Sequence, residues 1–235
     1  MSEKPIKPIK LIIWDLDGTL IEFKINSVKA RRKAIKVLRD FGIPNEKLSI
    51  EKPILENVKI SRVIFNELGL SSEKIKEIVN EVNNAVIQVE HEAAINATLI
   101  QGIDQVLEFA KKKKLKQAVF TYNTHNNAKI SLETAGISHY FEAIVGRDDT
   151  KNPKPHPDHL KHICEKIDVK PDQIVVIGDT GRDIEAAINI GSRSIALNTK
   201  IPSYLKREFF KFQANIIIEP EQIPSKLIEA LENFL

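Results

Sequence analysis

The sequence predicts an α/β protein in which a doubly wound parallel sheet is interrupted, just after its first strand, by a helical insert. After Gly102, short apolar runs alternate with segments of helical periodicity to the end of the chain. Between residues 26 and 97, apolar residues recur at helical spacing, and Gly and Pro are sparse. Since strands and helices that alternate over short connections demand a parallel sheet covered on both faces, we expect a core of residues 1–21 and 99–235 and a helical cap of residues 22–98.

The first strand is predicted from residues 9–15, IKLIIWD, an apolar run that ends in an acid and is followed by a turn at Gly18. The insert reads as a bundle of three or four helices. Its breaks are expected at residues 42–44, at Pro53 and at Gly69, and Ser71 or Ser72 would cap the long last helix.

The remaining elements alternate in type and complete a Rossmann-like core. We expect helices at about 103–114, 126–135, 157–167, 182–190 and 203–211, and a final amphipathic helix from about Pro224. Strands are expected at 117–121, 143–146, 174–178, 193–197 and 215–218. Lys111–Lys114 would lie in the last turn of a helix, where cations complement the helix dipole.

Composition argues against several classes of protein. The 235 residues are 42% hydrophobic and 29% charged, and 35 basic residues against 32 acidic ones give a net charge of +3, too balanced for a nucleic-acid binder. No 18 consecutive residues are apolar, and the start of the chain lacks the apolar stretch of a secretory signal. The single cysteine, Cys164, fits a reducing compartment. We therefore expect a soluble, cytoplasmic protein that binds neither nucleic acid nor membrane.

Polar side chains collect where the predicted strands end, which is the edge at which open α/β sheets bind ligands. They are Asp15 and Asp17, Thr121, and Asp179 and Asp183, with Lys154 in the loop NPKPHP. Four carboxylates at one edge would repel one another unless a cation sat among them, and oxygen ligands favour Mg²⁺. A hydroxyl and an ammonium beside that ion would make a receptor for a phosphoryl group.

Other polar residues have structural interpretations that compete with functional ones. Asp179 and Asp183 also suit the start of a helix, and residues 123–125 suit either substrate contact or a polar turn with an N-cap. His156, His159 and His162 recur every three residues, but no cysteine or acid completes a transition-metal site. The basic stretch from Lys24 to Lys33 reads as a solvated helix face, with an anionic substrate tail as the alternative.

Four motifs in this order resemble those of the haloacid dehalogenase-like hydrolase superfamily, especially its phosphoglycolate phosphatase-like members with a helical cap. They are the signature Asp15-Leu16-Asp17-Gly18-Thr19, the run Ala118–Thr121, the lysine motif Lys154-Pro155, and Gly178-Asp179 through Asp183. The resemblance implies a Mg²⁺-dependent phosphatase that acts on a small phosphorylated substrate through an aspartyl-phosphate.

The resemblance also implies a role for each residue. Asp15 would be the nucleophile and Asp17 the general acid and base. Thr121 and Lys154 would hold phosphoryl oxygens. The metal would be held by Asp15, Asp179 and the main-chain carbonyl of Asp17, and Asp183 would orient Lys154 or a metal-bound water.

Asp17 argues against two other activities of the superfamily. Dehalogenases lack an acid at this position, because a halide needs no proton, and phosphonate-cleaving members commonly have a small residue there. A phosphomutase stays open, as does a non-hydrolytic phospho-acceptor or scaffold. The sequence predicts neither the particular phosphoester, nor the cap residues that select it, nor the oligomeric state.

Overall fold

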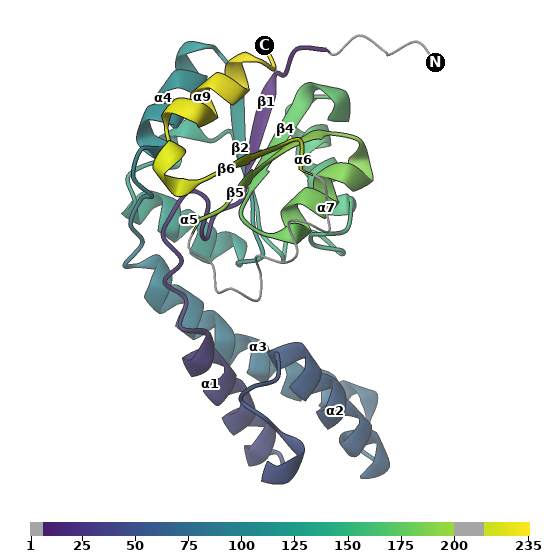
Figure 1. Cartoon of the computed structure of the whole chain (residues 1–235). Helices are drawn as coiled ribbons and strands as arrows, with labels where there is room; N and C mark the ends of the chain where they lie inside the picture. The colour runs from purple at the N-terminus through teal and green to yellow at the C-terminus, as the bar shows by residue number, and fades with distance from the viewer. Residues whose placement is uncertain (1–6, 200–213) are drawn as a thin grey trace. The chain divides into compact units, whose positions relative to one another are not determined.

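A computed structural model describes residues 7–199 and 214–235 and confirms the predicted α/β class (Figure 1). Within these residues, six parallel strands form one sheet in the order β3-β2-β1-β4-β5-β6. The strands are β1 Leu11–Trp14, β2 Lys116–Phe120, β3 Ala143–Val145, β4 Ile174–Gly178, β5 Arg193–Leu197 and β6 Ile216–Ile218. The strand order reverses at β1, which pairs with β2 on one side and β4 on the other, so the carboxyl end of β1 is the expected ligand position.

Helices cover both faces of this sheet. On one face Ile12 and Trp14 of β1 share an apolar cluster with residues of α4 (Ile103–Lys112), α5 (His125–Thr134) and α9 (Ser225–Glu232). On the other face Leu11 and Ile13 contribute to a cluster with α6 (Asp158–Ile167) and α7 (Gly181–Ile190). Because side chains alternate along a strand, the residue that follows Trp14, Asp15, continues the α6/α7 side. Strands buried on both faces explain the unbroken apolar runs of the sequence.

The chain separates into two compact units, Met1–Phe23 with Asn96–Leu235, and Lys24–Ile95. We call them the core unit and the helical unit. In the core unit, the two segments that lead to the helical unit are joined by a bridge between Ile21 and Leu99 and by the Glu22 N–H, which donates to the carbonyl of Thr98 at 2.9 Å.

The helical unit has an apolar centre of its own. Its α-helices are α1 Ser27–Asp40, α2 Ile54–Glu67 and α3 Ser72–Ala94, and the described residues 41–53 between α1 and α2 add one short 3-10 turn, Asn45–Lys47. Leu38 of α1, Phe65 of α2 and Ile78 of α3 are buried against one another's helices. Asn26 caps α1, and Ser71 caps α3 by accepting a hydrogen bond from the N–H of Lys74.

Several boundaries differ from the sequence predictions by a few residues. The helix expected at 103–114 ends at Lys112, because Lys114 adopts a left-handed conformation with φ of 59°. Three further 3-10 turns, Ser138–Tyr140, Pro171–Gln173 and Pro220–Gln222, lie in loops of the described chain. The helix predicted at 203–211 lies outside the described residues. In the described ranges, no helix combines the length and the apolar character needed to cross a membrane.

Candidate active site

The carboxyl end of β1 places Asp15 in the middle of the sheet edge. The Asp15 N–H donates to the carbonyl of Ile177 at 2.8 Å and so extends the pairing of β1 with β4. The chain then turns at Gly18, whose φ of 88° favours glycine. A Cβ at Gly18 would lie 2.1 Å from Oδ2 of Asp179, so the absence of a side chain lets Asp179 approach this turn.

Three of the four predicted carboxylates meet here. Asp15, Asp179 and Asp183 are buried, and each offers an oxygen within 4.8 Å of the others, the one such group of three His, Cys, Asp or Glu residues among the described parts of the chain. The hydroxyl of Thr19, which the sequence analysis did not single out as a site residue, lies 3.4 Å from an oxygen of Asp15 and from one of Asp179. The Asp17 side chain is not in this group.

Lys154 supplies positive charge to the cluster. Its ammonium forms ion pairs with Asp15 and with Oδ1 of Asp183, the latter at 2.7 Å, and donates to the carbonyl of Phe120 at 3.3 Å. The other oxygen of Asp183 accepts hydrogen bonds from the N–H of Thr180 at 2.9 Å and from its hydroxyl at 2.6 Å. Asp183 therefore caps α7 and positions Lys154 at the same time.

The electrostatics of the cluster indicate an excess of negative charge. Burial raises the pKa of Asp179 well above its ordinary value, and the charges of Asp15 and Asp183 raise it further. Burial also raises the pKa of Asp15, although the ammonium of Lys154 opposes that shift. Burial lowers the pKa of Lys154, but Asp15 and Asp183 outweigh it, so this pKa lies above the ordinary value and the lysine stays charged. One ammonium faces three carboxylates, an arrangement that a divalent cation would stabilise.

Thr121 and Asp17 lie at the neighbouring strand end. Thr121 is buried, its N–H donates to the carbonyl of Val145 at 3.1 Å, and its hydroxyl accepts from the N–H of Asn123 at 3.0 Å. The Asn123 amide donates to Oδ2 of Asp17 at 3.4 Å. Of the two interpretations of this loop, Thr124 fits the structural one, since it caps α5, whereas Asn123 contacts a predicted catalytic acid.

His159 holds the backbone of the Lys154 loop in place, a role that the sequence did not indicate. This buried imidazole accepts a hydrogen bond from the N–H of Lys154 at Nδ1, 3.0 Å away, so its Nε2 carries the proton and donates to the carbonyl of Val145 at 3.0 Å. Burial lowers its pKa to about 4. Because both ring nitrogens are engaged by the backbone, His159 is not available to the transition-metal site considered for the three histidines.

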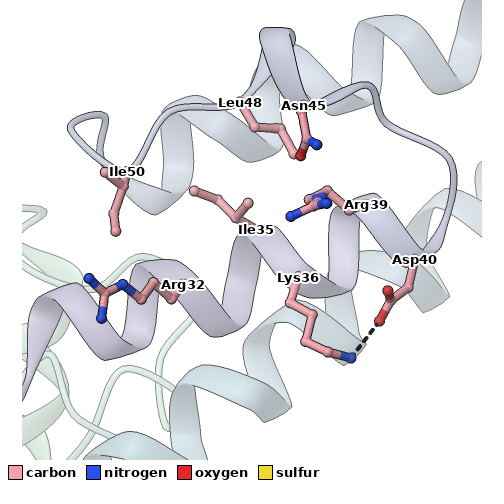
Figure 2. Close-up of a pocket in the computed structure, with 8 residues that line it drawn as sticks. All are labelled: Arg32, Ile35, Lys36, Arg39, Asp40, Asn45, Leu48 and Ile50. Carbon is pink, nitrogen blue, oxygen red and sulfur yellow. Dashed lines mark hydrogen bonds and ion pairs between the residues drawn. The ribbon is translucent and has the colours of Figure 1, made fainter.

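A separate hollow of about 640 Å³ lies within the helical unit and contains none of the predicted site residues (Figure 2). It is lined by Arg32, Ile35, Lys36, Arg39, Asp40, Asn45, Leu48 and Ile50. Elsewhere on α1, Lys29 and Lys33 form ion pairs with Glu92 of α3 at 2.5 and 3.9 Å. Those pairs fit the solvated helix face predicted for this basic stretch, whereas Arg32 is one of the residues that line the hollow.

Comparison with known proteins identifies the family. Residues 12–197, most of the chain, match the family of haloacid dehalogenase-like hydrolases, and this range includes the six predicted site residues. The chain belongs to this family. The resemblance inferred from the four motifs is thereby confirmed.

Relatives within the haloacid dehalogenase-like hydrolases differ in the substrates that their names give. The chain is 26% identical to a phosphoglycolate phosphatase of Aquifex aeolicus, over 90% of this chain and 100% of that protein. It is 25% identical to pyrophosphatase PpaX of Oceanobacillus iheyensis, over 90% and 92%. Among solved structures, a β-phosphoglucomutase from Clostridium difficile superposes with a TM-score of 0.63 at 21% identity, covering 96% of this chain and 97% of that one. The last likeness shows a shared fold.

Proposed function

We propose that this enzyme is a Mg²⁺-dependent phosphatase that hydrolyses small phosphomonoesters through an aspartyl-phosphate on Asp15. The observation that carries the proposal is the buried cluster in which the Lys154 ammonium lies against Asp15 and Asp183, with Asp179 beside them. A carboxylate held against an ammonium at a strand end can attack a phosphoryl group. Phosphoryl transfer depends mainly on neutralising the negative phosphoryl oxygens and on positioning the reactants, and it does not require a strongly basic nucleophile.

The residues present fit a divalent cation. All three clustered donors are carboxylate oxygens, the donor type that Mg²⁺ prefers. Burial, together with the charges of Asp15 and Asp183, raises the pKa of Asp179, and one ammonium does not balance three carboxylates. Asp15, Asp179 and the main-chain carbonyl of Asp17 would hold the ion. When bound, it would neutralise carboxylate and phosphoryl oxygens that otherwise repel each other.

The chain's own groups account for both half-reactions. An oxygen of Asp15 attacks phosphorus in line and the ester bond breaks, while Asp17 donates its proton to the leaving alcohol. Asp17 then takes a proton from water, and the water oxygen attacks phosphorus. The bond between phosphorus and the Asp15 oxygen breaks, which releases inorganic phosphate and restores the Asp15 carboxylate. Lys154 and Thr121 hold the non-bridging oxygens throughout, and Asn123, which contacts Asp17, orients that acid.

Two finer proposals accompany this function. The helical unit, Lys24–Ile95, is proposed to be a cap that excludes water from the site during turnover. Action in the cytoplasm is proposed because the one cysteine of the sequence, Cys164, is buried and its thiol has its pKa raised to about 11 by burial, properties of a structural rather than a reactive or paired cysteine.

The test is phosphate release from a panel of sugar, nucleotide and small-acid phosphates, with Mg²⁺ and with a chelator. We expect Mg²⁺-dependent turnover that Asp15→Asn abolishes. Asp172→Asn, at an exposed aspartate before the amino end of β4, is the matched control and should retain activity. Absence of turnover on the whole panel would refute a phosphatase.

The same assay separates the remaining alternatives. A phosphomutase would move the phosphoryl group to a second hydroxyl of the substrate and release little inorganic phosphate. A phospho-acceptor would accumulate a stably phosphorylated chain, visible by intact mass spectrometry, without turnover.

A further inference from the structure

The guanidinium of an exposed arginine lies over the ring of an exposed tyrosine beside the candidate active site. The guanidinium carbon of Arg182 lies 5.3 Å from the ring centroid of Tyr122, and the Tyr122 residue is 39% exposed. The quadrupole of an aromatic ring attracts a guanidinium that lies over its face. Two exposed side chains are therefore ordered by each other at the surface of the core unit.

The sheet order places this cation–π contact across the strand that carries Asp15. Tyr122 follows β2, and Arg182 is the second residue of α7, directly after the turn that ends β4. Since β2 and β4 are the two neighbours of β1, a contact between residues beyond their carboxyl ends spans the carboxyl end of β1. The chain neighbours of the pair, Thr121 and Asp183, are buried parts of the site.

The charge of Arg182 is available to a ligand. In the described parts of the chain, no carboxylate forms an ion pair with Arg182, whereas its neighbour Asp183 is fully engaged by Lys154 and Thr180. The contact with the ring uses none of the N–H donors of the guanidinium in a hydrogen bond to an acceptor, so these donors can bind an oxyanion. The loop that carries Tyr122 is itself fixed, since Nη1 of Arg147 donates to the Tyr122 carbonyl at 2.6 Å.

We propose that Arg182, oriented by Tyr122, binds a second oxyanion of the substrate. The ligand class is a phosphomonoester that carries another anionic group, such as a carboxylate, close to its ester. The proposal rests on the proposed function, in which the transferred phosphoryl group occupies the Asp15–Lys154 site. Arg182 would bind the other anionic group of the same substrate. Arg182 would thus be a specificity-determining residue and Tyr122 a positioning residue.

The test measures binding, so that it does not depend on turnover. Calorimetry in buffer with Mg²⁺ compares phosphonoacetate and 3-phosphonopropionate with ethylphosphonate and propylphosphonate, which lack the carboxylate. We expect the better carboxylated ligand to bind about tenfold or more tightly than its alkyl counterpart, the lower range for hydrogen bonds to charged groups. Arg182→Gln should bring this ratio close to one, and Arg182→Lys should recover only part of it, because a lysine lacks the planar fork.

Variants of the partner residue separate orientation from general damage. Tyr122→Ala should lower the ratio severalfold, and Tyr122→Phe, which keeps the ring, should preserve it. Lys170→Gln removes an exposed charge before the amino end of β4 and is the matched control. Equal binding of both ligand classes by the wild-type protein, or an unchanged ratio in Arg182→Gln, would overturn the proposal.

The two proposals fail in distinguishable ways. Tight binding of carboxylated phosphonates that depends on Arg182, without hydrolysis of any phosphoester, would contradict the phosphatase and leave the oxyanion subsite standing. Hydrolysis with no preference for a second anion would do the reverse.

Discussion

Replacement of Lys154 with methionine tests the electrostatic account of the site. The ammonium is buried and bonded to Asp15 and Asp183, so its removal leaves buried carboxylates without their cation. Breaking a buried ion pair in this way costs roughly 3–5 kcal/mol. Against a total unfolding free energy of roughly 5–15 kcal/mol, this is a large fraction, and we expect Lys154→Met to be folded but much less stable at pH 8 without Mg²⁺.

The cost should depend on pH with a definite sign. In the wild-type protein the pKa of Asp15 is already raised by burial, and loss of Lys154 would raise it further. At pH values above the raised carboxylate pKa, the variant should therefore have a lower free energy of unfolding than the wild type. The difference should shrink as pH falls, because the folded state binds protons that the unfolded state does not. Each such proton offsets about 1.4 kcal/mol per pH unit.

Urea unfolding of the wild-type and variant proteins at pH 8, 7, 6 and 5 measures this difference. Lys112→Met, at an exposed lysine late in α4, is the control and should change stability by less than about 0.5 kcal/mol. A Lys154→Met protein as stable as wild type at pH 8, or a cost that does not shrink toward pH 5, would refute the account of Lys154 as the counter-charge of the cluster.

Three other predictions follow from the site. For His159, the pKa of about 4 in the folded state lies below the unfolded value of about 6.5, so its contribution to the free energy of unfolding is complete above pH 6.5 and is lost as pH falls toward 4. His159→Gln should therefore flatten the pH dependence of the unfolding free energy by about 3 kcal/mol over that range. Parallel wild-type and variant curves would contradict this. Gly18→Ala should lower the free energy of unfolding, measured by heat or urea, by at least about 1–2 kcal/mol, because a residue in a left-handed conformation gains a Cβ that clashes with Asp179. The variant should also bind Mg²⁺ more weakly in calorimetry. Normal Mg²⁺ affinity would refute the close approach of Asp179 to the Gly18 turn. Asp17→Asn should lower kcat roughly 10²–10⁴-fold. Its Mg²⁺ affinity should stay near wild type, because residue 17 would hold the ion through its main-chain carbonyl. A near-normal kcat at pH 7 would exclude Asp17 as the general acid and base.

The sequence predicted the framework of the site because its signals are local. A buried strand that ends in Asp15 and a strand-to-helix turn that carries Asp179 and Asp183 are each readable within a few residues. Parallel strands bring their carboxyl ends to one edge, so the convergence of these acids needed no knowledge of long-range contacts. The contact between Lys154 and Asp183 came instead from the family resemblance, which implied that Asp183 orients either Lys154 or a metal-bound water.

The supporting residues were not predictable on these grounds. His159 lies in a helix whose pattern gave no reason to single it out from His156 and His162, and its function depends on contacts with the backbone of Lys154 and Val145. The cation–π contact between Arg182 and Tyr122 joins residues 60 positions apart, and it depends on the strand order. Such contacts arise from tertiary packing, to which a single sequence offers no direct signal.

The two oxygens of the Asp183 carboxylate bind different partners, so this residue is needed for two separate reasons. One oxygen stops α7 from fraying at its first turn, and the other holds the ammonium that the chemistry requires. A screen for heat-resistant variants, run without any phosphoester, would therefore reject changes at this position for reasons unrelated to turnover. Catalytic competence would be maintained by selection for folding alone.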